Sequence, residues 1–387
     1  MRKIKIFMLH LGYGGIERQT ITMANSLTND FIVEIISFYK LNNKPAYNID
    51  PKIKIKYLYE GKPNRDEFKG ALKKLKLLKI FKEGMKAIKI IWLKFKLIKD
   101  EIKEDDADIY FTTREEHAKI LSKYGKKSKL KITEEHNFIS DSKYRRRIVK
   151  EYKNLNYVVV ISKYHEKMYK NWFKKTNVKI IRIENILSYR PKNKSKLNNN
   201  AVVAAGRFNY IKDFLTLIEV MKNAVKDNPD LKLYLLGDGE EKDKIIKKIK
   251  ENKLEENVIM PGFVGTELVH DYMSKSDIYL MTSKNECFPI VLLESMSLGL
   301  PIISFDILTG PREIVKNNKN GYLIPNRDAK LMAYKVNELL KDKNKLKEFG
   351  KYGYNQSLNY SIEKIKTKWI KLFSSMEWYY EKSIVYL

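Results

Sequence analysis

Short apolar runs alternate with longer segments of helical periodicity along most of the chain. This alternation is typical of strand–helix–strand units, whose parallel strands are buried on both faces. A first series of strands is expected at residues 3–9, 31–37, 108–112, 130–134 and 157–161. A second series is expected at residues 201–205, 232–236, 258–260, 278–281 and 301–304. The pattern therefore predicts an α/β protein with two doubly wound domains.

A polar stretch, RPKNKSKLNNN at residues 190–200, separates the two series and has the composition of a linker. We expect an N-terminal domain over residues 1–187 and a C-terminal domain over residues 188–361. A last helix at about residues 362–387 is expected to pack back on the first domain. The length of 387 residues suits two such domains.

Charge is distributed unevenly along the chain. The formal net charge is +29, and residues 1–190 carry 44 basic and 22 acidic residues, so the first half holds most of it. Anionic partners are therefore favoured. The sequence has no long uncharged apolar run and a single cysteine, Cys287, which cannot form an internal disulfide. We expect a cytoplasmic protein that does not span a membrane.

Residues that directly follow strands are candidates for ligand binding, because ligands of open parallel sheets bind beyond the carboxyl ends of the strands. After the first expected strand, Gly12, Gly14 and Gly15 precede a helix and could bring backbone N–H groups to a phosphate. The spacing is not the dinucleotide pattern, and a purely structural turn explains it equally well. His136 follows the fourth strand and is a second candidate, although a lone histidine is usually structural.

Two cations follow the strand at residues 201–205. Gly206 leads to Arg207, and Lys212 lies five residues further on. Arginine offers a planar fork and lysine a compact charge, so this pair could bind a diphosphate. Chance placement is the alternative in a chain with 76 basic residues.

Two glutamates flank an apolar segment, ECFPIVLLE, at residues 286–294. Pro289 suits the first turn of a helix, which leaves Glu286 in the preceding loop and Glu294 about two turns away. We expect neither carboxylate to have a basic partner, so hydroxyl groups of a polyol ligand would satisfy them. The alternative is a charge at the helix start together with an unrelated surface glutamate.

Taken in order, these motifs resemble those of the family 4 retaining glycosyltransferases, which have the GT-B fold. The motifs are Gly14-Gly15-Ile-Glu-Arg, Glu135-His136-Asn, Gly206-Arg207 with Lys212, Leu236-Gly-Asp-Gly-Glu240, Glu286 with Glu294, and Gly310-Pro-Arg-Glu-Ile-Val315. The resemblance covers nearly the whole chain and is strongest over residues 201–326. Cys287 departs from the glycine that many members have at this position. It is expected to be a packed side chain and not a nucleophile.

The resemblance implies two Rossmann-like domains that face each other across a deep cleft. The second would bind a nucleotide sugar, most often a UDP-hexose in this family, and the first a saccharide or lipid-linked acceptor for a surface polysaccharide or glycolipid. Arg207 and Lys212 would stabilise the leaving diphosphate, Glu286 would bind the donor sugar and Glu294 the ribose. His136 would contact the sugar, and Gly14 and Gly15 would border the diphosphate. The expected donor site also includes Gly206, which precedes Arg207. It further includes the three residues that follow Glu286, namely Cys287, Phe288 and Pro289.

No cofactor and no catalytic metal are expected. Asp106-Ala-Asp108 has the Asp-x-Asp spacing of metal-dependent glycosyltransferases. It precedes its strand, however, and so lies at the wrong end for the ligand crevice. We interpret it as a solvated turn.

Residues 68–104 form a basic helical segment. Apolar residues recur every three or four positions at Leu72, Leu75, Leu78, Phe81, Met85, Ile88, Trp92 and Phe95, and residues 69–103 hold 12 lysines and three acids. Such a segment suits an anionic membrane surface, with Lys82, Lys86, Lys89 and Trp92 as contacts. It could instead pack on the first domain.

Two other functions compete with glycosyl transfer. A nucleotide-sugar epimerase of the same fold would convert the free donor without an acceptor. Nucleic-acid binding would suit the charge, but no recognised binding motif is present, so no nucleic-acid partner is expected.

Overall fold

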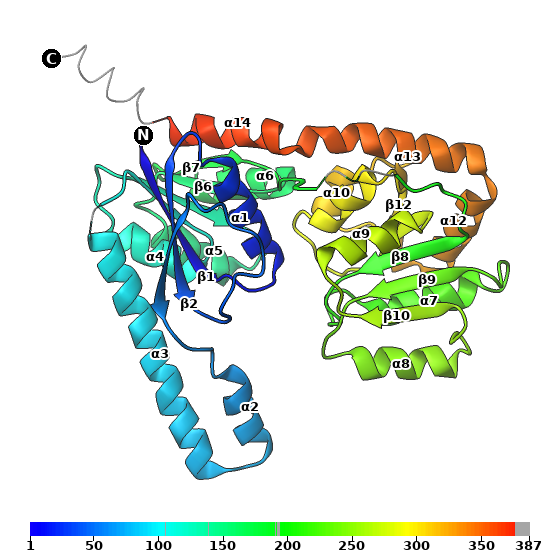
Figure 1. Ribbon diagram of the computed structural model, residues 1–387, viewed down its shortest axis with the longest axis horizontal. Coiled ribbons are helices and arrows are strands. Elements are labelled where there is room, and N and C mark those ends of the chain that lie inside the picture. The colour runs from blue at the N-terminus through cyan, green and yellow to red at the C-terminus, as the bar shows by residue number, and fades with distance from the viewer. Residues whose placement is uncertain (105, 138, 190, 192–193, 376–387) are drawn as a thin grey trace. The chain divides into compact units, whose positions relative to one another are not determined.

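The computed structural model describes residues 1–375 apart from 105, 138, 190, 192 and 193. By its internal contacts the chain divides into two compact units. The first comprises Met1–Ile161, Glu166–Ile183 and the chain from Lys366 on, and the second comprises Ser162–His165 and Glu184–Ile365. Each unit is built around one parallel sheet (Figure 1), which confirms the predicted α/β class with two doubly wound domains.

The first sheet has seven strands in the order β3-β2-β1-β4-β5-β6-β7. Its strands are β1 (Lys3–His10), β2 (Ile32–Tyr39), β3 (Lys54–Tyr59), β4 (Ile109–Thr112), β5 (Leu130–Glu135), β6 (Tyr157–Val160) and β7 (Lys179–Arg182). The helices between them are α1 (Gly15–Ser26), α2 (Arg65–Lys73), α3 (Leu77–Lys103), α4 (Glu115–Tyr124), α5 (Ser142–Glu151) and α6 (Lys163–Phe173).

The second sheet has six strands in the order β10-β9-β8-β11-β12-β13. Its strands are β8 (Ala201–Ala205), β9 (Lys232–Leu236), β10 (Val258–Gly262), β11 (Ile278–Met281), β12 (Ile302–Phe305) and β13 (Gly321–Ile324). The helices are α7 (Phe214–Ala224), α8 (Lys242–Glu251), α9 (Thr266–Ser274), α10 (Ile290–Ser297), α11 (Gly310–Ile314), α12 (Ala329–Lys341) and α13 (Lys343–Ser357). Helix α7 packs against α8 and α12, and α10 packs against α13.

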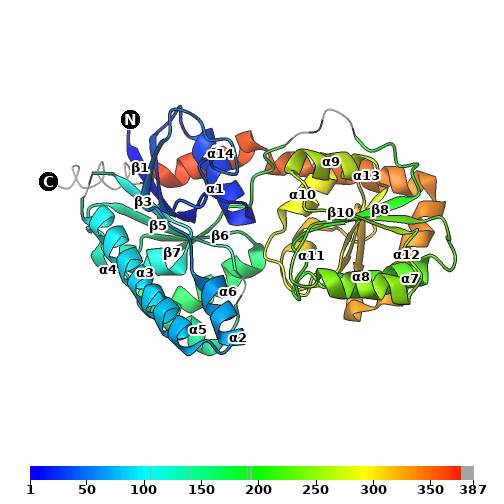
Figure 2. The same ribbon diagram turned by 60° about the horizontal axis from the view of Figure 1, so that its bottom comes forward.

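Helix α14 (Ile362–Phe373) closes one face of the first sheet. The ring of Trp369 lies 5.4 Å from that of Phe111 on β4, and Phe373 lies 5.8 Å from Phe31. Figure 2 shows α1 and α14 on one side of this sheet and α3, α4 and α5 on the other. The helix had been expected to continue to about residue 387, and its last part, 376–387, lies outside the described residues.

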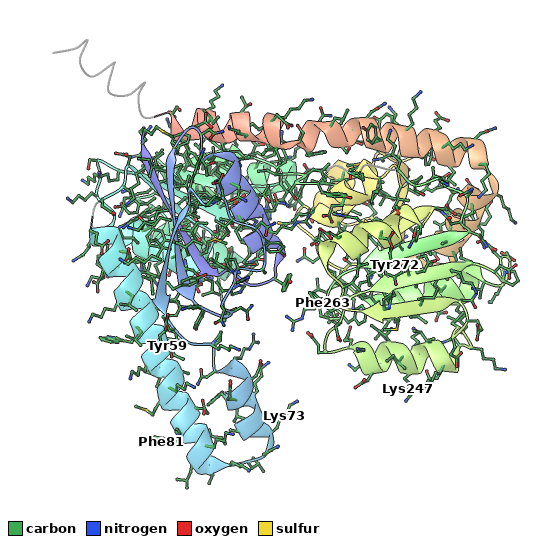
Figure 3. All side chains as sticks on the ribbon, viewed as in Figure 1. Tyr59, Lys73, Phe81, Lys247, Phe263 and Tyr272 are labelled. Carbon is green, nitrogen blue, oxygen red and sulfur yellow. The ribbon has the colours of Figure 1, made fainter. Side chains whose placement is uncertain are left out.

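The basic segment at 68–104 is two helices and not one. Helix α2 packs beside the first part of α3, and Leu75 between them has a positive φ of 48°, a conformation that interrupts a helix. In Figure 3 the labelled Phe81 and Lys73 lie near the far end of this hairpin, and Tyr59 lies near its base. The buried residues of α3, namely Ile90, Ile98, Glu101 and Ile102, are all in its second half.

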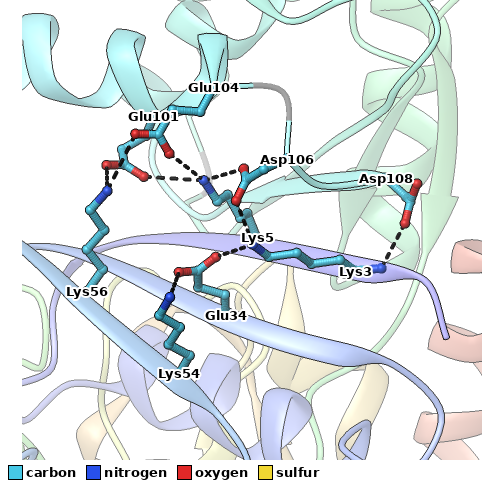
Figure 4. A network of polar contacts seen from close by, with 9 residues as sticks. All are labelled: Lys3, Lys5, Glu34, Lys54, Lys56, Glu101, Glu104, Asp106 and Asp108. Carbon is cyan, nitrogen blue, oxygen red and sulfur yellow. Dashed lines mark hydrogen bonds and ion pairs between the residues drawn. The ribbon is translucent and has the colours of Figure 1, made fainter.

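An ion-pair network fixes the second half of α3 to the sheet (Figure 4). The buried Lys5 amine on β1 lies 3.1 Å from Glu104, 3.3 Å from Glu101 and 2.5 Å from Asp106. Burial alone would lower the pKa of Lys5, but the nearby carboxylates, Asp106 foremost, raise it above its usual value.

The two aspartates of the Asp-x-Asp sequence are structural. Asp106 binds the amines of Lys3 and Lys5, and Asp108 accepts a hydrogen bond from the backbone N–H of Lys3 at 2.9 Å. Both precede β4, at its amino end, as predicted.

Candidate active site

The candidate donor site of the second unit lies where the strand order reverses. Strand β8 is the first of this sheet in the chain, and β9 and β11 flank it on opposite sides. In a doubly wound sheet the loops that follow such neighbouring strands diverge and leave a ligand crevice at their carboxyl ends. Lys212 is in the segment after β8, and Glu286 is in the loop after β11.

Lys212 and Glu286 form an ion pair in the structure. The Ser283 hydroxyl donates a second hydrogen bond to the same Glu286 oxygen at 2.9 Å. Gly206 leaves room for the lysine, because a Cβ atom placed there would lie only 3.2 Å from Lys212 Cε. The two residues are 74 positions apart, and the fold brings them together.

Arg207 does not join this pair. Its guanidinium Nε lies 3.2 Å from Glu240, and both side chains are more than half exposed, at 72% and 58%. An exposed pair of this kind contributes at most about 1 kcal/mol. Arg207 can therefore leave Glu240 for a more highly charged partner at little cost.

The expectation that both glutamates lack a basic partner was wrong. Glu286 pairs with Lys212, and Glu294 on α10 lies 3.1 Å from His270 Nε2 on α9. Both members of the second pair are buried, and the ring of Tyr189 stacks on the imidazole at 3.8 Å. The expectation failed because His270 is 24 residues away and lies on another helix.

The loop before α10 is held from the other side by the start of α11. The Gly310 N–H donates to Cys287 O at 2.8 Å, and the Thr309 hydroxyl donates to Glu286 O. A Cβ atom at Gly310 would lie 2.5 Å from Pro289 Cδ and 2.7 Å from Cys287 O, so only glycine fits this contact. The glycine motif at 310 thus shapes the loop that carries Glu286.

Pro289 precedes the helix instead of lying in its first turn. It takes the N-cap position, and α10 begins at Ile290. Phe288 is buried, and its carbonyl accepts a hydrogen bond from Asn185 at 2.7 Å. Cys287 is also buried, with its sulfur 3.3 Å from His165 Nδ1. Cys287 and Phe288 therefore build the loop.

Arg327 is a structural residue of the site that the sequence did not indicate. Its guanidinium donates to Asp213 Oδ2 and Thr282 O, both at 2.6 Å, and to Ser283 O at 2.9 Å. It thereby ties the segment after β8 to the loop after β11. No local signal marks this residue, because it lies 114 positions from Asp213.

In the first unit, Gly14 and Gly15 form the start of α1 as expected. Behind them the buried Glu17 accepts a hydrogen bond from Arg114 at 2.6 Å. His10 Nε2 lies 3.8 Å from Glu17, and burial lowers the pKa of His10 although Glu17 opposes this shift. The sequence analysis missed this cluster. Its signal was the position of Arg114 directly after β4.

His136 follows β5, as predicted, and its Nε2 lies 3.1 Å from Glu134. The neighbouring Glu135 is fully buried, and its Oε1 accepts a hydrogen bond from the Tyr152 hydroxyl at 2.6 Å. Burial raises the pKa of Glu135 to about 7, and the charge of Glu115 adds to the shift. The strand end therefore holds one histidine and a carboxyl group that titrates near neutral pH.

Two features are absent from the described residues. No group of three His, Cys, Asp or Glu side chains there could hold a metal ion. Within the same part of the chain, none of the helices has the length and apolar character that crossing a membrane requires.

Residues 185–356 match the family model of the "Glycosyl transferases group 1". The amylovoran biosynthesis glycosyltransferase AmsD of Erwinia amylovora is 36% identical over 172 residues, which cover 44% of this chain and about half, 47%, of that protein. The poly(ribitol-phosphate) alpha-N-acetylglucosaminyltransferase of Staphylococcus aureus is 29% identical over 369 residues, covering 89% of this chain and 72% of that one.

The fold is also that of solved glycosyltransferases. A complex of Staphylococcus aureus TarM with UDP aligns with 97% of this chain and 100% of its own, at a TM-score of 0.76 and 18% identity. Together with the two doubly wound sheets, this likeness shows the GT-B fold. The family model spans almost all of the unit that contains Lys212, Glu286 and Glu294. Residues 185–356 are thus similar to the group 1 glycosyl transferases, and the relatives of this segment include a glycosyltransferase of amylovoran biosynthesis.

Proposed function

We propose that this protein is a glycosyltransferase of family 4 and that it acts with retention of configuration. It would transfer a hexosyl unit from a nucleotide sugar, with UDP-hexose as the first candidate, to a saccharide or lipid-linked acceptor. The product would be a surface polysaccharide or glycoconjugate. The Lys212–Glu286 pair at the strand reversal of the second sheet carries this proposal.

The charges at this site suit a departing diphosphate. Lys212 is oriented by Glu286 and would meet the negative charge that develops as the bond to the sugar breaks. Arg207 would move from its weak surface pair with Glu240 to the same diphosphate. The start of α10 adds N–H groups that favour an anion. These groups supply positive charge, so we propose transfer without a catalytic metal.

The two glutamates would bind hydroxyl groups of the donor. One carboxylate oxygen of Glu286 accepts from Lys212 and Ser283, and the other oxygen would bind a sugar hydroxyl. Glu294 would bind the ribose, while His270 orients its carboxylate. Retention in family 4 is attributed to front-face attack, so no enzyme nucleophile is required. The buried Cys287 fits that proposal.

The first unit would bind the acceptor. Gly14 and Gly15 place the N-terminal N–H groups of α1 at the carboxyl edge of the first sheet, and His136 lies at the end of β5 on the same edge. We propose that the glycine backbone borders the diphosphate and that His136 contacts the donor sugar. Nothing in this arrangement calls for a cofactor.

Thermal stabilisation by intact nucleotide sugars tests the donor proposal. A ligand present at about 100 times its dissociation constant adds roughly 2.7 kcal/mol to the folded state. We expect a UDP-sugar to raise the melting temperature of the parent protein and to have much less effect on Glu294→Ala. A panel without any stabilising nucleotide sugar would overturn the donor assignment.

We also propose that the α2–α3 hairpin docks on the anionic inner face of the cell membrane. Its apolar stripe is exposed: Leu72, Leu75, Leu78, Phe81, Met85, Ile88, Trp92 and Phe95 are 39% to 90% exposed. Phe95, at the end of the stripe, contacts Tyr124 of the first unit with ring centroids 5.9 Å apart. Exposed apolar residues beside lysines combine insertion with electrostatic attraction. The ion-pair network at Lys5 anchors the base of the hairpin to the sheet (Figure 4).

Liposome sedimentation tests the docking. The variant with Lys82, Lys86 and Lys89 all changed to Glu removes three exposed cations that make no ion pair among the described residues. Each such lysine contributes about 1 kcal/mol near an anionic surface, so binding should collapse. The matched control reverses three exposed lysines of the second unit: Lys226, Lys250 and Lys343. Equal loss in both variants, or binding of oligonucleotides as tight as that of liposomes, would contradict membrane docking.

A further inference from the structure

A cavity of about 640 Å³ lies in the first unit, outside the residues discussed so far. One face of α5 and one residue of α6 line it: Ser142, Arg145, Arg146, Val149, Lys150 and Trp172. The five α5 residues recur at intervals of three and four, so they share a single face of that helix. The volume is that of a small-molecule site.

The cavity wall carries positive charge without compensation. Arg145, Arg146 and Lys150 are exposed and form no ion pair with any described residue. By contrast, the adjacent Arg147 is paired with Glu115 at 2.8 Å on another side of the helix. A merely solvated helix face usually intersperses acids with bases. This face gathers three cations and no acid.

The acidic residues that flank the cavity-lining segment of α5 are both engaged, and Glu151 at its far end pairs with Lys119 at 2.7 Å. Asp141 is the N-cap of α5, and its carboxylate accepts a hydrogen bond from the Tyr144 N–H at 2.9 Å. A carboxylate in this position also compensates the N-terminal end of the helix dipole. Arg145, Arg146 and Lys150 are therefore available to bind an anionic ligand.

Trp172 of α6 adds one aromatic side chain to the lining of the cavity. Trp172 is 9% exposed, and its ring stacks on Tyr169 with centroids 4.9 Å apart. Its other neighbour, Tyr144, lies 6.2 Å away and is fixed by a hydrogen bond to Glu115 at 2.8 Å. The tryptophan is thus held in place before any ligand arrives, and it offers an apolar surface to a carbon skeleton.

We propose that this cavity binds a phosphate-bearing part of the acceptor, an inference that rests on the proposed glycosyl transfer. Two arginines on successive positions present planar forks to phosphate oxygens, and Lys150 adds a point charge. The volume exceeds that of one phosphate group, so a phosphodiester or diphosphate with part of its attached sugar or alditol fits. Trp172 packs against the carbon atoms of that group.

The test uses the full chain and two soluble probes, inorganic pyrophosphate and a glycerol phosphate oligomer. Binding is followed by tryptophan fluorescence, with Trp172→Phe identifying the signal from the cavity. We expect the double variant Arg145→Ala/Arg146→Ala to raise the dissociation constant for the preferred probe at least tenfold, because charge-assisted hydrogen bonds are lost. Tighter binding of one probe by the parent protein distinguishes a diphosphate from a phosphodiester chain.

The matched control is Lys143→Ala/Lys153→Ala, which removes two exposed cations near the same helix that do not line the cavity. Its dissociation constant should stay within twofold of the parent value. Equal weakening in both double variants, failure of both probes to bind, or a probe signal lost only in Arg207→Ala would overturn the cavity assignment. UDP binding is measured separately. Its failure would instead contradict the proposed donor site and leave the cavity result standing.

Discussion

The most quantitative prediction concerns Glu135, the fully buried carboxyl group at the end of β5. We expect Glu135→Gln to abolish a large part of the pH dependence of stability. Burial raises the pKa of Glu135 to about 7, above the value of about 4.5 for an unperturbed glutamate. The ionisable groups around it are Glu115 on α4, Tyr144 on α5, Tyr152 directly after α5, Tyr169 on α6 and His136 directly after β5.

The sign and size of the change in stability with pH follow from the linkage between proton binding and folding. A carboxyl group whose pKa is raised in the folded state binds its proton more tightly there than in the unfolded chain. The contribution of Glu135 to the free energy of unfolding is therefore complete below about pH 4.5 and is lost as the pH rises through 7. Each pKa unit corresponds to about 1.4 kcal/mol, so the group should cost the parent protein about 2 to 3 kcal/mol between pH 5 and pH 8. Glutamine does not titrate and keeps an acceptor for the Tyr152 hydroxyl.

Urea unfolding at pH 5 and pH 8, followed by tryptophan fluorescence, measures this difference. The four tryptophans are Trp92, Trp172, Trp369 and Trp378, and none of them lies within residues 184–365, so the signal reports on the domain that holds Glu135. Groups that do not interact with Glu135 titrate equally in both proteins, among them the buried His117, whose pKa burial lowers to about 4. Subtracting the variant from the parent therefore isolates Glu135 together with the groups coupled to it.

The control is Glu60→Gln, an exposed glutamate on the same domain, which should follow the parent at both values of pH. The free energy of unfolding of Glu135→Gln and that of the parent could instead fall by the same amount between pH 5 and pH 8. Glu135 would then be ionised in the folded protein at both pH values. That result would refute the account of the buried cluster behind His136.

Three further predictions concern the donor site and the hairpin. Glu294→Ala should raise the donor KM more than it lowers kcat, because ribose contacts exist in both the ground and transition states; an unchanged KM would remove Glu294 from the site. Arg207→Ala and Lys212→Ala should each lower kcat on the order of 100-fold. Turnover should continue in the presence of EDTA. If EDTA abolishes activity and magnesium or manganese restores it, the metal-free mechanism is contradicted. The triple lysine reversal in α3 should abolish liposome binding yet leave transfer to a soluble acceptor analogue nearly normal, and unaltered sedimentation would exclude docking through this helix.

Most central strands could be predicted from the sequence because they are short, continuous apolar runs. The strands at 201–205, 232–236 and 278–281 have the predicted bounds, and β1, β2, β4, β5, β6, β10 and β12 differ from the prediction by one or two residues at either end. The three strands that were missed, β3, β7 and β13, are all at the edges of their sheets. β3 (KIKYLY) and β7 (KIIR) contain lysine or arginine and are only partly buried, so their apolar signal is weak. β13 (GYLI) is apolar and mostly buried, but it is only four residues long and begins with glycine.

The partners of the site residues could not be predicted in the same way. The sequence singled out Lys212, Glu286 and Glu294 because each follows a strand or flanks an apolar helix. Their ion pairs depend on residues that only the tertiary fold brings near, 74 positions away for Lys212 and 24 for His270. The sequence also could not predict that the apolar stripe of the α2–α3 hairpin is exposed. Helical periodicity defines an apolar face but does not say whether another part of the protein covers it.

The central claim is retaining transfer from a nucleotide sugar, and proton NMR of a reaction mixture tests it most directly. The purified protein is incubated with UDP-hexoses, with and without saccharide and lipid-linked acceptors, while the anomeric signals of donor and product are followed. The account predicts that UDP is released only as an acceptor becomes glycosylated, and that the new bond keeps the anomeric configuration of the donor. A product of inverted configuration, or conversion of the free donor into an isomeric nucleotide sugar without any acceptor, would contradict it.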